Sequence, residues 1–514
     1  MPHTLVSPSR RKNQAHATRA VPSLSLLPSS RLQGKAYKHM EPSSAAARLL
    51  LLVAVAAVAA ASGATTGALA ATPSPRPNPK LRGLRVRLTH VDAHGNYSRL
   101  QLLQRAARRS HHRMSRLVAR ATGAASTSSS KAAAAGDGSG GKDLQVPVHA
   151  GNGEFLMDLS VGTPALPYAA IVDTGSDLVW TQCKPCVECF NQTTPVFDPA
   201  ASSTYAALPC SSALCADLPT STCASSSSSS SASSPCGYTY TYGDASSTQG
   251  VLATETFTLA RQKVPGVAFG CGDTNEGDGF TQGAGLVGLG RGPLSLVSQL
   301  GIDRFSYCLT SLDDAAGRSP LLLGSAAGIS ASAATAPAQT TPLVKNPSQP
   351  SFYYVSLTGL TVGSTRLALP SSAFAIQDDG TGGVIVDSGT SITYLELRAY
   401  RALRKAFVAH MSLPTVDASE IGLDLCFQGP AGAVDQDVQV QVPKLVLHFD
   451  GGADLDLPAE NYMVLDSASG ALCLTVMASR GLSIIGNFQQ QNFQFVYDVA
   501  GDTLSFAPAE CNKL

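Results

Sequence analysis

Much that a membrane protein or a metalloprotein needs is missing from this sequence of 514 residues. The longest apolar run, at 49–61, covers about 13 residues, which is shorter than the ~20 residues of a membrane-spanning helix. No apolar tail ends the chain, so we expect no lipid anchor there. Cys183, Cys186 and Cys189 are closely spaced, but no second CxxC motif or His pair follows at ligand spacing. We therefore expect no membrane span, no zinc or other metal, and no cofactor.

Acidic residues and cysteines are scarce in the first part of the chain. Residues 1–143 contain 22 Lys and Arg but only 4 Asp and Glu, whereas 144–514 contain 15 basic and 32 acidic residues, a net charge of −17. All twelve cysteines lie between Cys183 and Cys511. Nucleic-acid binding needs clustered Lys and Arg. We therefore expect an acidic body with up to six disulfides, formed in an oxidising compartment, and no nucleic-acid partner for that body.

The apolar run at 49–61 has the length of the central region of a signal peptide. Ala68-Leu69-Ala70 offers a cleavage site of small residues, so 1–70 is interpreted as a leader. Met40 is a better start than Met1 for such a signal. Residues 1–39, with seven basic and no acidic residues, also resemble a transit peptide. We expect a secreted protein, extracellular (apoplastic) or vacuolar, with the chloroplast as the alternative.

A basic region follows the leader. Residues 98–120 place apolar side chains at helical intervals between arginines, which predicts a basic amphipathic helix. These side chains are Leu102, Leu103, Ala106, Ala107, Met114, Leu117 and Val118. We interpret 71–143 as a prosegment of net charge +11 that lies on the acidic body. A solvated linker helix, or a helix that binds nucleic acid or a membrane surface, is the alternative.

From residue 144 onward the sequence predicts an all-β structure. Short runs of Val, Ile, Leu, Tyr and Phe alternate with clusters of Gly, Pro, Asp and Ser. Helices are expected only near 293–300 and 396–410, and the serine run at 224–234 is expected to be a loop.

This body contains an internal repeat. AIVDTGSDLVW (170–180) and VIVDSGTSITY (384–394) match in pattern over eleven positions. Each copy is followed by an apolar-apolar-Gly run, which ends at Gly288 in the first half and at Gly486 in the second. The repeat predicts two homologous β lobes with Asp173 and Asp387 side by side at their junction.

Two facing carboxylates support a specific chemistry. Held about 3 Å apart, they share one proton, so the ionised carboxylate activates a water molecule while the neutral one protonates the developing oxyanion. Asp173 and Asp387 are therefore the expected catalytic pair. Gly175 and Gly389 are expected to let the backbone turn tightly below each Asp. Four hydroxyl side chains are expected to hold the carboxylates, namely those of Thr174, Ser176, Ser388 and Thr390.

With these motifs, the sequence from about 145 to 514 resembles the pepsin family of aspartic endopeptidases. The resemblance implies a bilobal fold with a cleft between lobes at 144–340 and 341–514. It also implies a flap at Tyr238–Gly250, in which Tyr242, Gly243 and Asp244 lie over the cleft and Trp180 supports Tyr242. The implied activity is peptide hydrolysis at acidic pH by a monomeric enzyme made as a zymogen, with proteins or peptides as substrates.

The Cys-rich insertion at 183–236 is similar to that of the nepenthesin-type plant enzymes. This resemblance implies the pairs Cys183–Cys186, Cys189–Cys271, Cys210–Cys236, Cys215–Cys223, Cys308–Cys511 and Cys426–Cys473. Spacing alone leaves the connectivity open. Asn96 and Asn191 each begin an N-glycosylation sequon.

Two other functions remain as alternatives. Some plant proteins of this fold, the xylanase inhibitors, are proteolytically inactive binding proteins, but here DTGS, DSGT and YGD are all intact. A plastid protease that binds DNA would need the basic region 80–120 in its mature form. In the leading interpretation, a Lys or Arg of the prosegment lies near the two Asp until acid releases it, and cleavage follows near Gly136–Leu144.

Overall fold

The computed structural model describes residues 83–92, 97, 99–121, 155–223, 233–243, 246–277, 280, 283–311, 314, 319–417, 419–429, 440–466 and 469–514. These residues all belong to one compact unit, Pro75–Leu514. Several sequence-based predictions lie outside the described residues: the leader, the cleavage region at Gly136–Leu144, the serine run at 224–232, Asn96 and Asp244.

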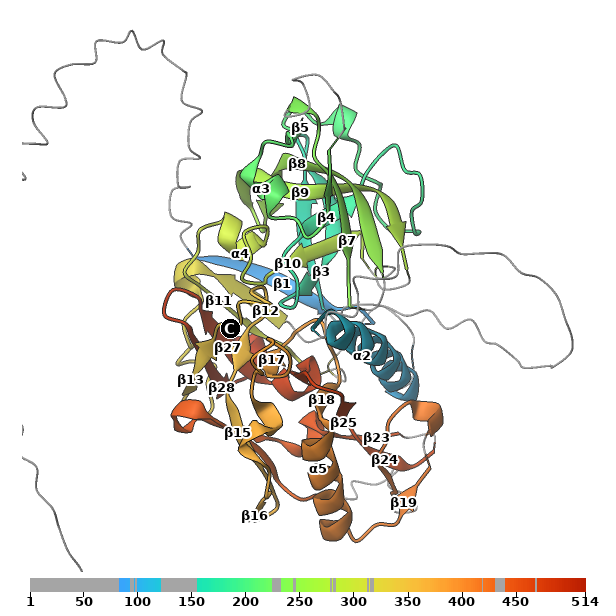
Figure 1. Ribbon diagram of the computed structural model, residues 1–514, viewed down its shortest axis with the longest axis vertical. Coiled ribbons are helices and arrows are strands. Elements are labelled where there is room, and N and C mark those ends of the chain that lie inside the picture. Colours follow the sequence, from blue (N-terminus) through green and yellow to red (C-terminus); the bar gives the residue numbers. More distant parts are fainter. Residues whose placement is uncertain are drawn as a thin grey trace, which may run out of the picture. The chain divides into compact units, whose positions relative to one another are not determined.

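The body is built almost entirely of strands in two lobes, as the repeat predicts (Figure 1). The strands of the first lobe are β2 (Phe155–Val161), β3 (Leu166–Asp173), β4 (Val179–Gln182), β5 (Ala206–Ala207), β6 (Ser221–Thr222), β7 (Gly237–Thr241), β8 (Ser247–Leu259), β9 (Gln262–Glu276) and β10 (Gly285–Gly288). Those of the second lobe are β14 (Tyr354–Val355), β15 (Leu357–Val362), β16 (Thr365–Arg366), β17 (Val384–Val386), β18 (Thr393–Glu396), β19 (Thr415–Val416), β20 (Cys426–Gln428), β21 (Leu445–Phe449), β22 (Asp454–Leu457), β23 (Met463–Leu465), β24 (Ala471–Leu474), β25 (Val476–Ser479) and β26 (Ser483–Ile485).

An antiparallel sheet of six strands joins the lobes, in the order β1-β12-β11-β27-β28-β13. Its strands are β1 (Leu84–His90), β12 (Ser319–Leu323), β11 (Arg304–Cys308), β27 (Phe493–Asp498), β28 (Thr503–Pro508) and β13 (Gln339–Val344). β1 comes from the predicted prosegment and also pairs with β2. Its residues alternate between buried and exposed because successive side chains of a strand point to opposite faces. Sequence analysis did not predict this strand, although its L-x-V-x-L alternation was a signal for one.

The predicted helices are present. α2 (Arg99–Ala121) confirms the helix expected at 98–120, and α4 (Leu296–Gln299) and α5 (Leu397–His410) lie where the other two were expected. A further short helix, α3 (Ala213–Ala216), lies in the Cys-rich insertion.

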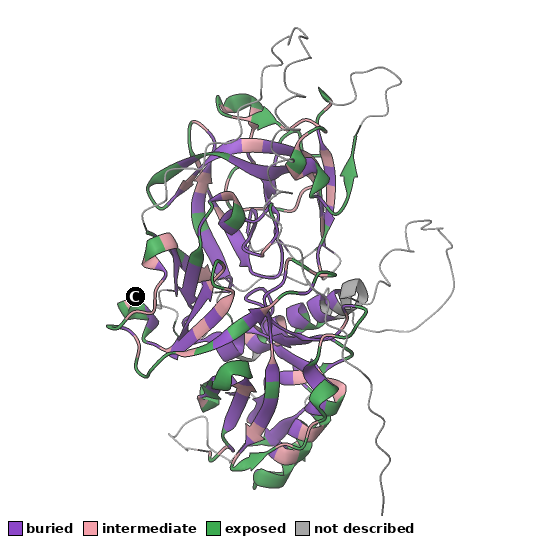
Figure 2. Ribbon diagram, turned by 60° about the vertical axis from the view of Figure 1, so that its left-hand side comes forward, coloured by how far each residue is buried: buried purple, intermediate pink, exposed green. Residues whose placement is uncertain are grey.

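The apolar face of α2 is packed against the body. Five of its side chains are buried, namely Leu103, Ala106, Ala107, Met114 and Leu117. They belong to a hydrophobic cluster with second-lobe residues, and the helix is largely coloured as buried in Figure 2. None of the helices in the described part of the chain is long and apolar enough to cross a membrane.

Four of the six predicted disulfides are wrong, and each of the four involves a cysteine of the Cys-rich insertion. The structure pairs Cys183 with Cys271 and Cys186 with Cys189, rather than Cys183 with Cys186 and Cys189 with Cys271. The reason is strand register, because β4 pairs with β9 so that Thr181 lies opposite Cys271. The Cys183 N–H also donates to the Gly272 carbonyl (2.8 Å), which brings the two buried cysteines together.

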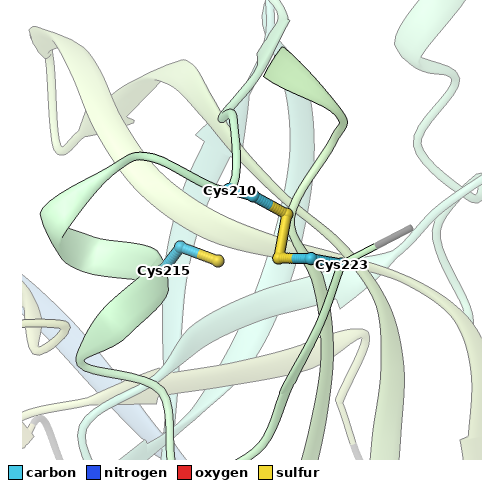
Figure 3. A group of neighbouring side chains, drawn as sticks. All are labelled: Cys210, Cys215 and Cys223. Atoms are coloured by element: carbon cyan, nitrogen blue, oxygen red, sulfur yellow. A yellow bond between two sulfur atoms is a disulfide. The ribbon is translucent and has the colours of Figure 1, made fainter. Parts of the chain in front are cut away.

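The other two corrections concern Cys210, Cys215, Cys223 and Cys236. The bridges are Cys210–Cys223 and Cys215–Cys236, rather than Cys210–Cys236 and Cys215–Cys223. The sulfurs of Cys210, Cys215 and Cys223 lie within 4.8 Å of one another (Figure 3), so their closeness in space does not by itself select a partner. Burial distinguishes the two possible pairings, because Cys215 and Cys236 are both buried and pair with each other, whereas Cys223 is exposed. The predicted bridges Cys308–Cys511 and Cys426–Cys473 are confirmed.

Candidate active site

Asp173 and Asp387 lie at the ends of equivalent strands. β3 ends at Asp173 and pairs in parallel with β10, with Gly288 opposite Asp173. β17 ends one residue before Asp387 and pairs in parallel with β26, and the Asp387 N–H donates to the Ile485 carbonyl at 3.1 Å. The apolar-apolar-Gly runs are therefore the partner strands of the two Asp motifs. Both carboxylates are fully buried.

The two loops are bonded to each other across the lobe junction. The Thr174 N–H donates to the Ser388 hydroxyl (3.2 Å), and the Ser388 N–H donates to the Thr174 hydroxyl (2.9 Å). The Thr174 hydroxyl also donates to the Val386 carbonyl, and the Ser388 hydroxyl donates to the Val172 carbonyl, so each reaches the strand of the opposite lobe. Thr174 and Ser388 thus join the lobes and do not hold the carboxylates, contrary to the prediction.

The predicted carboxylate contacts of the other two hydroxyls are present. Ser176 donates to Asp173 Oδ2 and Thr390 donates to Asp387 Oδ2, both at 2.6 Å. The N–H groups of Gly175 and Gly389 each donate to the Oδ1 of the Asp in their own motif, both at 2.9 Å. Hydrogen bonds of this kind favour the ionised carboxylate.

The two motif glycines are required by close approach across the junction. A Cβ on Gly175 would lie 2.9 Å from Asp387 Oδ1, and one on Gly389 would lie 2.4 Å from Asp173 Oδ1. Real Cβ atoms essentially never come this close to another atom. The glycines therefore allow each Asp to lie against the opposite loop.

Arg113 of α2 occupies the space in front of both carboxylates. Its Nη2 lies 2.6 Å from Asp173 Oδ1 and 3.1 Å from Asp387 Oδ1, and its Nε lies 2.9 Å from Asp387 Oδ2. The Arg113 side chain is only 3% exposed. Burial acts to lower the Arg113 pKa, but the two carboxylates outweigh it, so the pKa lies well above its usual value. Sequence analysis expected a Lys or Arg here but could not select one among the many arginines of the helix.

The Asp387 carboxyl has a raised pKa. Burial is the largest cause, Arg113 acts in the opposite direction, and the nearby Asp173 raises the pKa further. An Asp in this environment binds a proton at a higher pH than an ordinary Asp does.

Two further contacts fix α2 over the dyad. The Ser110 hydroxyl accepts from the N–H groups of Ser391 and Ile392, both at 2.9 Å, directly after the second Asp motif. The buried Asp92, which follows β1, forms ion pairs with Arg105 (2.8 Å) and Arg109 (3.0 Å) of the helix. Sequence analysis named none of these residues.

The predicted flap covers the same site. β7 and β8 form a hairpin, and a Cβ on Gly243 would lie 3.0 Å from the Arg113 carbonyl oxygen and from Leu117 Cγ of α2. Tyr242 is buried, and burial raises its pKa well above the usual value. Trp180 and Tyr242 both pack edge-on against Phe280, with ring centroids 4.6 and 5.2 Å away. Phe280 is therefore a site residue that sequence analysis missed.

Groups with metal-ligand geometry are few in the described part of the chain. Cys210, Cys215 and Cys223 form one such group there, but all three are disulfide-bonded and present no thiolate. The dyad carboxylates are occupied by a guanidinium group instead.

Comparison with known proteins gives the same assignment throughout the body. The family models that match are described as "Xylanase inhibitor N-terminal" (residues 155–325) and "Xylanase inhibitor C-terminal" (352–508). Aspartic proteinase nepenthesin-1 from Nepenthes gracilis is 46% identical over 434 residues, which cover 84% of this chain and 91% of nepenthesin-1. Aspartyl protease 37 from Oryza sativa subsp. japonica is 37% identical over 480 residues, which cover 87% of this chain and 98% of that protein.

The solved structure of edgp aligns with a TM-score of 0.54 at 20% identity and covers 70% of this chain and 94% of edgp. Basic 7S globulin from soybean aligns with a TM-score of 0.51 at 20% identity, covering 69% of this chain and 92% of the globulin. At this identity the two structures show the fold alone. The chain belongs to the nepenthesin-type plant aspartic proteases, which are endopeptidases of the pepsin-like fold.

Proposed function

We propose that this chain is the inactive precursor of a secreted aspartic endopeptidase, and that Arg113 is the residue that keeps it inactive. The observation that carries the proposal is the guanidinium group in contact with both carboxylates beneath the flap. A water molecule and a peptide carbonyl need the same space for hydrolysis. While Arg113 is in place, neither can reach Asp173 and Asp387.

Once α2 has left, Asp173 and Asp387 share one proton. The ionised carboxylate takes a proton from a water molecule, which attacks the scissile carbonyl, and the neutral carboxyl donates its proton to the carbonyl oxygen. The C–N bond of the tetrahedral intermediate then breaks. The carboxyl that received the water proton gives it to the leaving amine nitrogen, and the other carboxylate takes a proton back from a hydroxyl of the intermediate, which restores the shared proton. Ser176, Thr390 and the two motif glycines keep each carboxylate oriented through the hydrogen bonds described above. The flap closes over the substrate in place of the helix.

Acid releases the prosegment in this proposal. Protonation of the dyad removes the partners of Arg113 and leaves a buried, unpaired guanidinium group, which is strongly unfavourable. Because Arg113 is buried, salt screens this contact little, whereas it screens the exposed pair between Arg87 and Asp158. Cleavage near Gly136–Leu144 then separates the prosegment of 71–143 from the enzyme.

Secretion is supported by the six disulfides and by the exposed sequon at Asn191, which is accessible to glycosylation. The chloroplast alternative with DNA binding is less well supported. Arg109 and Arg113 are buried against the body while the helix is bound, so they are not available to phosphates. The names of the family models suggest an inactive binding protein as the other alternative. An arginine that blocks an intact dyad favours the peptidase, because a protein without catalytic activity has no activity to block.

The test is Arg113→Met in the full-length precursor, secreted from a eukaryotic host, with Arg108→Ala as the control. Arg108 lies on the same helix and is exposed. We expect the Arg113→Met precursor to cleave a quenched peptide at about pH 5.5, above the ordinary carboxyl range, before any change in its mass. The wild type and Arg108→Ala should stay inactive there until they are processed at lower pH. An unprocessed wild type that is fully active near neutral pH would contradict the proposal.

A further inference from the structure

The backbone carbonyls of the two catalytic Asp residues accept hydrogen bonds from different kinds of donor. In the first lobe, the Asp173 carbonyl accepts from the backbone N–H of Leu289 (2.8 Å), the residue after Gly288. The corresponding residue of the second lobe is Asn487, but its N–H donates to the Thr390 carbonyl (2.7 Å). The Asp387 carbonyl instead accepts from the side chain of Gln490 at 3.3 Å. A side-chain amide thus replaces a backbone donor beneath Asp387.

Gln490 contacts the second catalytic loop and its partner strand β26 at once. Its Nε2 donates to the Ile485 carbonyl (2.9 Å) as well as to the Asp387 carbonyl. Ile485 is the residue whose carbonyl also accepts from the Asp387 N–H. The amide is fully buried, and leaving its partners unsatisfied in the interior would be costly.

Tyr307 fixes the orientation of this amide. Its hydroxyl donates to Gln490 Oε1 and accepts from the Tyr497 hydroxyl at 2.8 Å. An amide flipped by half a turn would present N–H groups to Tyr307 and an oxygen to the two loop carbonyls. Burial raises the pKa of both tyrosines far above their usual value, so both phenols remain neutral donors.

The chain of contacts reaches the other lobe. The Thr174 side chain forms a hydrogen bond with the Tyr497 hydroxyl, and this bond partly offsets the rise in the Tyr497 pKa. Tyr497 lies in β27 and Tyr307 in β11, which pair in the sheet that joins the lobes. The Tyr497 ring stacks on Phe305 with ring centroids 4.6 Å apart. The phenols therefore have little freedom to move.

We propose that Gln490, Tyr307 and Tyr497 are positioning residues of the peptidase, which hold the Asp387 loop in register with the Thr174 loop across the lobe junction. The inference rests on the proposed function, since it concerns the geometry of the dyad during hydrolysis. None of the three touches the carboxylates in the contacts described. They act through the backbone on either side of Asp387, where a displacement of a fraction of an ångström is enough to reduce turnover.

The test compares Gln490→Met with Gln494→Met in the full chain, after acid activation. Gln494 is also a fully buried glutamine, but it bonds to Ser306, Gly328 and Ser330, away from the dyad. We expect Gln490→Met to lower kcat roughly 10- to 100-fold with KM nearly unchanged, while both variants lose similar thermal stability. Tyr307→Phe should give a smaller kcat loss of the same kind, with Tyr462→Phe, whose hydroxyl donates to the Pro443 carbonyl, as its control.

Gln490→Glu supplies a readout that a purely structural role would not move. A protonated Glu presents one donor and one acceptor and preserves most of the network. An ionised Glu would place a charge against two carbonyls. Its kcat should therefore approach the wild-type value at low pH. As the introduced carboxyl ionises, kcat should fall in a step of its own, in addition to the fall that both enzymes show when the dyad loses its shared proton. Equal kcat values for Gln490→Met and Gln494→Met in an active enzyme would overturn the inference, whereas an inactive wild type would instead overturn the proposed function.

Discussion

The two lobes carry equivalent Asp loops but are stabilised by different means, and the proposed prosegment contacts each of them differently. Four of the six disulfides lie within the first lobe, whereas Cys426–Cys473 lies within the second. Strand β1 pairs with β2 and β12 of the first part of the body. The apolar face of α2 and its Ser110 contact second-lobe residues. β1 and α2 of the proposed prosegment therefore contact both lobes, with Arg113 bridging the Asp of one lobe and the Asp of the other.

The largest effect is expected from the pair of carboxylates, where the lobes should be equivalent. Asp173→Asn and Asp387→Asn should each lower kcat by roughly 100- to 10,000-fold, because an amide can serve neither as base nor as acid. The fold should remain, as judged by circular dichroism, and pepstatin should inhibit the wild type. Asp158→Asn, at an exposed site, is the control. Substantial activity in either dyad variant would show that the two lobes do not act as a pair.

The pH at which the precursor activates tests the raised pKa of Asp387. The raised pKa of Asp387 means that folding disfavours its ionised form. At a pH above the raised pKa, the ionised Asp387 carboxylate therefore lowers the free energy of unfolding of the precursor. As the pH falls through the raised pKa toward the usual Asp range, Asp387 binds a proton and this destabilisation is lost. A protonated Asp387 carries no charge and cannot form an ion pair with Arg113. Because the Asp387 pKa is raised, the Arg113 contact should weaken already at a pH above the usual Asp range of about 4. We expect the activation rate, followed by mass and activity, to rise as the pH falls through this window.

The reverse dependence would contradict that assignment. Asp498 provides a reference, because its hydrogen bond from Arg304 lowers its pKa and it lies outside the cleft. Asp498→Asn should leave the pH of activation unchanged. A precursor that activates only below the usual Asp range would indicate that Arg113 dominates over burial at Asp387.

The smallest effects concern the disulfides, and they should differ with loop length. Replacing both cysteines of Cys308–Cys511, which are 203 residues apart, should lower the free energy of unfolding by about 2–5 kcal/mol. The bridge Cys186–Cys189 closes a separation of only 3 residues, so its loss should lower the free energy of unfolding by less. Denaturant unfolding of the two double Ser variants measures the difference. Peptide mapping of the unreduced protein tests the pairing, and a peptide that links Cys189 to Cys271 would contradict it.

The sequence by itself determined the elements whose signal is local or repeated. Alternating runs predicted the strands, helical spacing predicted α2, and the two Asp motifs with their later glycines predicted the lobes and the dyad. The roles of Ser176 and Thr390 also followed, because each binds the Asp three residues before it. Such contacts depend on a short stretch of chain, and a sequence pattern is enough to describe them.

Only the tertiary structure decided which residues meet across long separations. It selected Arg113 from the arginines of α2, because that residue alone among the described contacts bridges both carboxylates. It assigned Thr174 and Ser388 to the opposite loop, paired the insertion cysteines by burial and strand register, and placed Gln490 beneath Asp387. The physical reason is common to all four. Each contact depends on how strands far apart in the sequence align and on which side chains face the interior, and neither is encoded in the spacing of residues along the chain.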